Sequence, residues 1–194
     1  MSDPRVGAVI LAAGEGSRFG AVKQLAILDG RPLIEHAVEA VEGVAAIGDI
    51  VVVLGAHAEE IRAGAALGSA RSVVCPDWAS GPTRSLLRGL EALGEVDAML
   101  VTLADQPRIT TQVIAMVLDY GLAARAPATR ATYAGAPGHP VLFRRSLFAR
   151  LGRSTDARGA RGLLAEVGAR QVEVGHLCDP LDVDTPEDME SLGR

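Results

Sequence analysis

The sequence predicts an α/β fold in which a mainly parallel β-sheet carries helices on both faces. Short apolar runs rich in valine, leucine and alanine recur along the first part of the chain, and a segment with the apolar spacing of a helix follows each one. Parallel strands need crossover connections of this length, and such crossovers are right-handed. A glycine-rich loop after the first run is also typical of parallel sheets that bind phosphates.

The predicted elements alternate in chain order. Buried strands are expected at residues 6–13, 49–56, 71–75 and 97–105. Helices are expected at residues 32–43, 58–67, 81–94 and 110–121. Pro32 suits the first position of its helix, and Gly43 follows the end of the same helix. Together these elements predict a three-layer, Rossmann-like sheet with strand order 3-2-1-4.

The regular alternation stops after about residue 122. The stretch "ARAPATRATYAGAPGHPVLF" at 124–143 is broken by proline and glycine, and predicts edge strands and a loop that forms a lip. A late strand at 169–176 and a terminal helix at 185–193 complete the pattern. Because the chain has no internal repeat, low-complexity tract or linker, we expect one domain over residues 1–194.

Composition excludes several classes of function. The formal net charge is -5, so no overall positive field attracts nucleic acid or a membrane surface. Cys75 and Cys178 lie far apart and have no neighbours at metal-ligand spacing, which favours idle thiols in a reducing compartment. With no leader-like or membrane-length apolar segment, the expected location is the cytoplasm.

The first loop, "LAAGEGSRFGAVKQL" at 11–25, does not fit two common phosphate-binding motifs. The dinucleotide motif G-x-G-x-x-G fails because Gly20 comes one place late after Gly14 and Gly16, and the second strand does not end in an acid. The P-loop motif fails because Lys23 is three residues past Gly20 and Gln24 follows it. If this loop binds an anion, it therefore does so in a different way from either motif.

The cations of this loop, Arg18 and Lys23, favour a site for a triphosphate. Arginine suits bidentate contact with phosphate, and lysine acts as a point charge. The alternative is that the glycines only form a turn and both cations face solvent.

The same loop, followed by "DGRPLIEHAV" at 29–38, resembles the signature L-A-A-G-x-G-x-R-x-G-x-x-K of the sugar-phosphate and cofactor nucleotidyltransferases. Within that superfamily the chain is most similar to the molybdenum cofactor cytidylyltransferases. The segments that carry this similarity are "PDWASGPTRSLLRGL" (76–90), "LADQP" (103–107), "GAPGHPVLF" (135–143) and "DVDTPEDM" (182–189).

The resemblance implies a nucleotide-diphospho-sugar transferase-like fold and a Mg²⁺-dependent reaction. In that reaction CMP passes from CTP to the phosphate of molybdopterin and pyrophosphate is released. The sister guanylyltransferases carry a second glycine where this chain has Ala13, and the extra methyl group leaves less room for a purine. Rival functions are transfer of GMP, activation of a sugar phosphate, and a non-catalytic module that delivers cofactor to a molybdoenzyme.

The resemblance also assigns the nucleotide site, with Arg18 and Lys23 as catalytic residues. Its expected members are Leu11, Ala12, Ala13, Gly14, Gly16, Arg18, Lys23, Asp77, Gly81 and Ser85. Two of these have structural alternatives, since Ser85 fits a solvent-facing position on its helix and Asp77 fits a turn.

Two aspartates are candidate Mg²⁺ ligands. The carboxylate of Asp105, the last residue of the fourth predicted strand, tolerates a polyphosphate only if a divalent cation bridges them. Helix capping is the alternative, but Thr110 or Thr111 is better placed to cap. Asp184 lies just outside the terminal helix, and the resemblance makes it the second ligand. Asp182 is expected to be structural.

The acceptor site is expected at Gly138 and His139, in the rigid stretch "GAPGHP". A structural role for the histidine remains open. The family often has a Gly-Asp-x-Gly-Ala-Arg run where this chain has "TDARGARGLL" at 155–164, so the role of Asp156 and the identity of the acceptor are less specified than the nucleotide chemistry.

Overall fold

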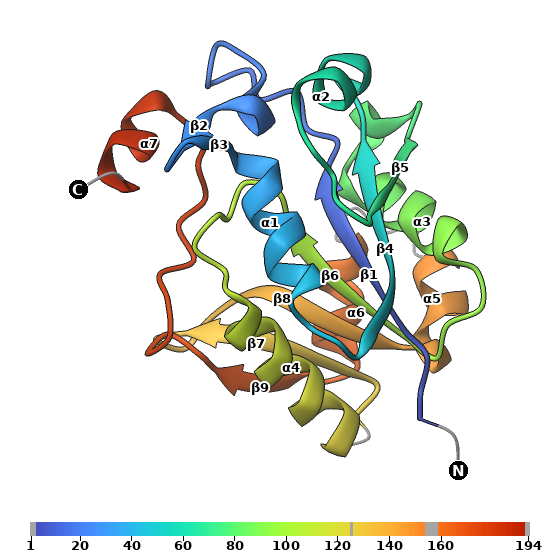
Figure 1. The fold of residues 1–194 in the computed structure, drawn as a ribbon. Helices are drawn as coiled ribbons and strands as arrows, with labels where there is room; N and C mark the ends of the chain where they lie inside the picture. Colours follow the sequence, from blue (N-terminus) through green and yellow to red (C-terminus); the bar gives the residue numbers. More distant parts are fainter. Residues whose placement is uncertain (1–2, 125, 154–158, 193–194) are drawn as a thin grey trace.

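A seven-stranded sheet runs through the computed structural model, which describes residues 3–124, 126–153 and 159–192 (Figure 1). Its strand order is β5-β4-β1-β6-β8-β7-β9. The strands are β1 (Val6–Ala12), β4 (Ile47–Leu54), β5 (Arg71–Val74), β6 (Ala98–Leu103), β7 (Ala128–Tyr133), β8 (Ala136–Arg144) and β9 (Arg170–Glu173). The first four strands of this sheet in chain order, β1, β4, β5 and β6, pair in parallel, which confirms the predicted order 3-2-1-4.

Helices cover both faces of this sheet, as predicted. One face carries α1 (Leu33–Glu42), α2 (Ala58–Gly64) and α4 (Thr111–Ala124). The other face carries α3 (Pro82–Leu93), α5 (Phe148–Arg153) and α6 (Gly159–Glu166). Short 3-10 turns occur at Lys23–Leu25, Trp78–Ser80 and Arg145–Leu147. No helix in the described part of the chain is long and apolar enough to cross a membrane.

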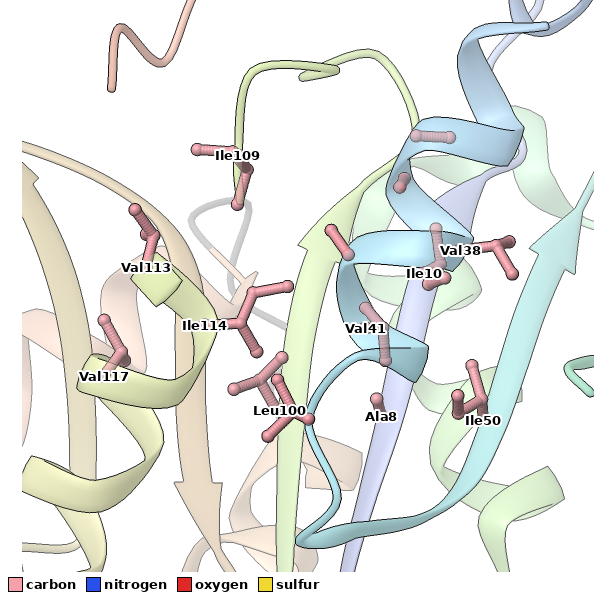
Figure 2. Close-up of a cluster of buried hydrophobic side chains, with 14 of the residues drawn as sticks. Ala8, Ile10, Val38, Val41, Ile50, Leu100, Ile109, Val113, Ile114 and Val117 are labelled. Atoms are coloured by element: carbon pink, nitrogen blue, oxygen red, sulfur yellow. The ribbon is translucent and has the colours of Figure 1, made fainter. Parts of the chain in front are cut away.

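The two faces of the central strands build two separate cores. On the face of α1 and α4, Ala8 and Ile10 of β1 meet Val38, Val41 and Ile114 of those helices (Figure 2). On the other face, alternate strand residues such as Val9, Val53 and Val101 pack under α3. Because both faces are buried, each central strand is a continuous apolar run in the sequence.

A third, smaller cluster lies at the end of the molecule where the C-terminal helix α7 (Pro186–Leu192) is found. It joins Leu28, Leu33, Val183 and Leu192, and Phe19 packs against it. Leu28 belongs to a small antiparallel hairpin of β2 (Ile27–Leu28) and β3 (Arg31–Pro32), beside which α7 lies in Figure 1. This cluster holds the C-terminal segment against the part of the chain that follows the first loop.

The prediction for residues 124–143 was wrong in one respect. β8 lies inside the sheet between β6 and β7, antiparallel to both, while β9 forms the edge. The prolines are tolerated because β8 pairs with β6 only from Val141 onward. Pro137 and Pro140 therefore lie on a part of the strand without that second neighbour, where a missing N–H is acceptable.

Candidate active site

The loop after β1 is shaped by glycine and held by one buried amide. Gly16 and Gly20 adopt left-handed φ angles of 65° and 76°, which side-chain-bearing residues rarely adopt. The Gln24 Nε2 atom donates hydrogen bonds of 3.0 Å to the carbonyl oxygens of both Ala12 and Gly14. Gln24 was not predicted as a site residue. No local sequence pattern marks Gln24, because an amide becomes informative only when its hydrogen-bond partners are known.

The side chains at the start of this loop face the protein interior. The methyl group of Ala12 lies in one core and that of Ala13 in the other, and both residues are buried. Any contact that they make with a nucleotide therefore comes from the backbone. The argument that the Ala13 methyl group limits the size of the base has no support from this packing.

Four residues that the sequence analysis assigned to two different roles meet in one ion-pair cluster. The Lys23 Nζ atom lies 2.7 Å from Asp105 Oδ2 and 3.1 Å from Asp184 Oδ1. The Arg18 Nη2 atom lies 2.8 Å from Asp184 Oδ2. The first loop, the end of β6 and the segment before α7 thus supply one site.

Lys23 is the buried centre of this cluster, with 8% of its surface exposed. Burial alone would lower the pKa of Lys23, but the charges of Asp105 and Asp184 and their hydrogen bonds outweigh it, so the pKa is raised. Lys23 therefore carries its positive charge at neutral pH.

The carboxylates fit a hard divalent cation. The Asp105 Oδ1 atom is buried and has no hydrogen-bond partner in the described part of the chain, so one strong acceptor is left for a ligand. No group of three or more His, Cys, Asp or Glu residues within the described ranges is arranged as a metal cluster. Two aspartates nevertheless suit Mg²⁺, which keeps several waters and takes one or two protein carboxylates.

A helix cap fixes the backbone beside Asp184. The Asp188 Oδ2 atom accepts hydrogen bonds from the backbone N–H of Asp184 at 2.9 Å, and from the N–H and hydroxyl of Thr185 at 2.8 and 2.9 Å. Thr185 thus directly precedes Pro186, the first residue of α7. In addition, the backbone N–H of Val183 donates to the carbonyl oxygen of Asp105 at 2.9 Å, which joins this segment to the end of β6.

Asp182 lies near the same cluster but has its own partner. Gln106 Nε2 donates to Asp182 Oδ1 at 2.8 Å and to the Pro180 carbonyl at 3.3 Å. Burial and the neighbouring charge of Asp105 raise the pKa of Asp182. Gln106 is 5% exposed and is a further residue that the sequence analysis did not assign to the site.

A cavity of about 960 Å³ opens next to the cluster, between α3, the sheet and α6. It is lined by residues from β1, β6, β7 and β8 as well as by these helices and the segment at Asp182. Four predicted site residues are part of the wall: Leu11, Gly81, Gly138 and His139. Gly81 has a φ of 111°, so the chain turns into α3 there in a conformation that favours glycine.

Ser85 and Asp77 were also predicted to contact the nucleotide, and the structure shows the surroundings of each. Ser85 is 4% exposed, so the solvent-facing alternative was wrong. Asp77 pairs with Arg84 at 3.4 Å and accepts from the Cys75 thiol at 3.4 Å. Asp156 lies outside the described residues.

His139 is part of strand β8 rather than of a loop. Burial, together with the charges of Arg130 and Arg161, lowers the pKa of His139 to about 4, so the ring is neutral at pH 7. The Tyr133 hydroxyl donates to the His139 carbonyl oxygen at 2.6 Å. His139, which the sequence analysis assigned to the acceptor site, is half-buried and borders the cavity.

Curated relatives match part of this chain. Nicotine blue oxidoreductase of Paenarthrobacter nicotinovorans is 40% identical over 116 residues, which are 59% of this chain and 56% of that protein. The bifunctional protein GlmU of Caulobacter vibrioides is 35% identical over 150 residues, which are 70% of this chain and 32% of that protein. The chain thus spans about half or less of the length of these relatives.

Solved structures match nearly the whole chain. Rv0371c of Mycobacterium tuberculosis superposes with a TM-score of 0.87 at 28% identity, covering 99% of this chain and 98% of that one. Its manganese complex superposes with a TM-score of 0.81, covering 97% of both chains. These likenesses confirm the predicted fold. Residues 8–174 match the MobA-like NTP transferase domain, and the chain therefore belongs to that family.

Proposed function

We propose that this protein is a nucleotidyltransferase that transfers CMP from CTP to the phosphate of a molybdopterin-type acceptor and releases pyrophosphate. The observation that carries the proposal is the cluster of Arg18, Lys23, Asp105 and Asp184 beside the cavity. It combines cations for a triphosphate with carboxylates for a metal ion. The motifs at 103–107 and 135–143 favour CTP and a molybdopterin acceptor within the family.

The reaction needs positioning and charge neutralisation rather than a protein nucleophile. An oxygen of the acceptor phosphate attacks the α-phosphorus of the nucleotide, and the bond between the α-phosphorus and the bridging oxygen breaks. The leaving pyrophosphate takes the bonding electrons. Lys23 and Arg18 stabilise the negative charge that grows on it, and the loop backbone held by Gln24 positions the phosphates.

A divalent cation completes the charge balance. Asp105 and Asp184 would hold it, with the free Asp105 Oδ1 atom as the first available ligand. Bound there, Mg²⁺ would neutralise the phosphate oxygens and orient them. The manganese complex of the Mycobacterium tuberculosis protein, which is 28% identical to this chain, supports the use of a divalent ion.

Pyrophosphate release tests this function. The protein would be incubated with Mg²⁺, a molybdopterin acceptor and, in turn, CTP, GTP, UTP or ATP. We expect release with CTP above that with the other nucleotides. A higher rate with GTP would make the protein a guanylyltransferase, and release only with a sugar phosphate as acceptor would make it a sugar-activating enzyme.

The remaining rivals predict no release of pyrophosphate. A delivery module would bind nucleotide without turnover. An oxidoreductase, which the 40% identity to nicotine blue oxidoreductase makes the second candidate, would instead transfer electrons between its substrate and a redox partner. The absorbance change of an added redox dye, measured in parallel, separates these two outcomes.

A further inference from the structure

One wall of the cavity has no role in the chemistry of the nucleotide phosphates. It is formed by β7, β8 and α6, and it presents Arg130, Gly138, His139 and Arg161 to the cavity. In the sheet, β8 and β7 come after β6, on the side away from β4 and β5. This wall therefore faces the part of the cavity that an acceptor would occupy.

Arg130 is a cation with no compensating acid among the residues that the structure describes. Its Nε atom is buried and has no hydrogen-bond partner among those residues. Burial and the positive charge of Arg161 both lower the pKa of Arg130, and no carboxylate of the described residues opposes this effect. A buried donor that is left unpaired beside a like charge destabilises a protein unless a ligand satisfies it.

The groups next to Arg130 and Arg161 do not offset the repulsion between these two positive charges. The ring of His139 is neutral at pH 7 and adds no charge. Arg84, the third arginine on the cavity wall, differs because it pairs with Asp77 at 3.4 Å. Since the whole protein has a formal net charge of -5, its overall field repels anions, and an anion reaches this wall only through local attraction.

We propose that Arg130 and Arg161 form a subsite for a phosphate monoester group of the acceptor. This inference rests on the proposed function and restricts its acceptor to phosphorylated molecules. Two guanidinium groups from different elements can share the oxygens of one phosphate dianion, each with paired N–H donors. The dianion offsets both positive charges, and its oxygens satisfy the unpaired donor of Arg130.

Inorganic phosphate is the probe for this subsite. Its binding would be measured by titration calorimetry at low ionic strength, without nucleotide or divalent metal. We expect Arg130→Met and Arg161→Met each to weaken binding at least about tenfold, because each loses charge-assisted hydrogen bonds. Malonate should bind more weakly than phosphate, and tighter malonate binding would overturn the phosphate assignment.

Arg170→Met is the matched control. Arg170 lies on β9 opposite Thr129 of β7, and paired residues of neighbouring parallel strands point to the same face. Arg130 follows Thr129, so it points to the opposite face, and Arg170→Met removes one charge nearby without touching the cavity. Loss of phosphate binding in Lys23→Met but not in the Arg130 and Arg161 variants would place the anion at the first loop and refute the subsite.

Stability separates a binding role from a structural one. In phosphate-free buffer Arg130→Met should unfold at the same or a higher temperature than the parent, because a repulsive pair is removed. Added phosphate should raise the unfolding temperature of the parent and not of the variant. A variant that is destabilised without phosphate, and still stabilised by it, contradicts the proposal.

The two proposals fail in different ways. If no nucleotide gives pyrophosphate but phosphate binding still depends on Arg130 and Arg161, the proposed function is wrong and the subsite stands. If CMP transfer occurs but Arg130→Met leaves the KM for a phosphorylated acceptor unchanged, the subsite is wrong and the function stands.

Discussion

Lys23 links the cations that are expected to bind the triphosphate to the aspartates that are expected to bind the metal ion. It is almost buried, and its ammonium group contacts both carboxylates that are expected to bind metal. Without it, Asp105 and Asp184 would face each other with only Arg18 to balance them. Lys23 therefore has a structural effect as well as the expected effect on the leaving pyrophosphate.

Replacing Lys23 by alanine should lower kcat far more than it weakens acceptor binding. Loss of one such preorganised donor costs on the order of 10²–10³ in rate. Steady-state kinetics with CTP and the acceptor would measure it, alongside urea unfolding to confirm the fold. Arg31→Ala, on the exposed hairpin of β2 and β3, is the control and should keep full turnover. Turnover of Lys23→Ala equal to that of the parent would remove Lys23 from the catalytic machinery.

Asp105 and Asp184 should behave as one unit. Asp105→Ala and Asp184→Ala should each abolish most activity, and the double variant should be little worse than either, because both act on a single ion. Manganese binding followed by electron paramagnetic resonance should be lost in the same variants. Glu190→Ala, on the exposed side of α7, should bind the ion normally.

Asp182→Ala should retain much more activity than Asp184→Ala. Asp182 has a hydrogen-bond partner in Gln106, whereas the oxygens of Asp184 contact the two cations of the first loop. An active Asp184→Ala together with an inactive Asp182→Ala would show that the metal assignment is wrong.

At the scale of single elements, the turn between β7 and β8 depends on one carboxylate. Glu173 of β9 accepts hydrogen bonds from the backbone N–H groups of Ala134, Gly135 and Gly175 and from the Thr132 hydroxyl. The N–H donors of Gly135 and Gly175 contribute most to lowering its pKa to about 2. Glu173 thus holds the hairpin that carries His139.

This lowered pKa predicts a defined dependence of stability on pH. The contribution of Glu173 is fully present above its unfolded pKa, for which the ordinary value is 4.5, and is lost as the pH falls toward about 2. Urea unfolding should therefore show Glu173→Gln less stable than the parent at pH 6, with a difference that shrinks between pH 4.5 and 2. A difference that does not change over this range would mean that the carboxylate is not held as described.

The elements show why the sequence predicted one half of the fold better than the other. Buried parallel strands such as β1 and β4 leave long apolar runs, and their crossovers leave helical spacing between them. β8 begins with Ala136, Pro137 and Gly138, residues that favour turns, and only its position inside the sheet makes it a strand. No local pattern carries that information.

As with the fold, the sequence predicted one part of the candidate site and not the rest. Charged residues in motifs, such as Arg18 and Asp105, stand out in a sequence because they are costly to place at the end of a buried strand or in a glycine loop. Gln24 and Gln106 do not stand out, since an amide becomes informative only when its partners are known. The proximity of Arg130 and Arg161 on one wall of the cavity likewise depends on tertiary structure.

At the scale of the whole molecule, the site depends on contact between the first loop and the C-terminal segment. Val183 is fully buried between Leu28 and Leu192, and its N–H is bonded to the Asp105 carbonyl. It lies directly before Asp184. Packing in this third cluster therefore sets the position of a carboxylate that the first loop contacts.

Val183→Ala should reduce activity more than its effect on stability explains. Removing two methyl groups from a buried valine costs about 1–3 kcal/mol of unfolding free energy. Val117→Ala, in the core between α4 and the sheet, is the matched control, since Val117 is equally buried and distant from the third cluster. Both variants should remain folded at 25 °C in urea titrations. Because Asp184 would be displaced, kcat/KM of Val183→Ala should fall on the order of tenfold or more, while that of Val117→Ala stays near the parent value. Equal losses in the two variants would show that the third cluster stabilises the fold without positioning the metal ligand.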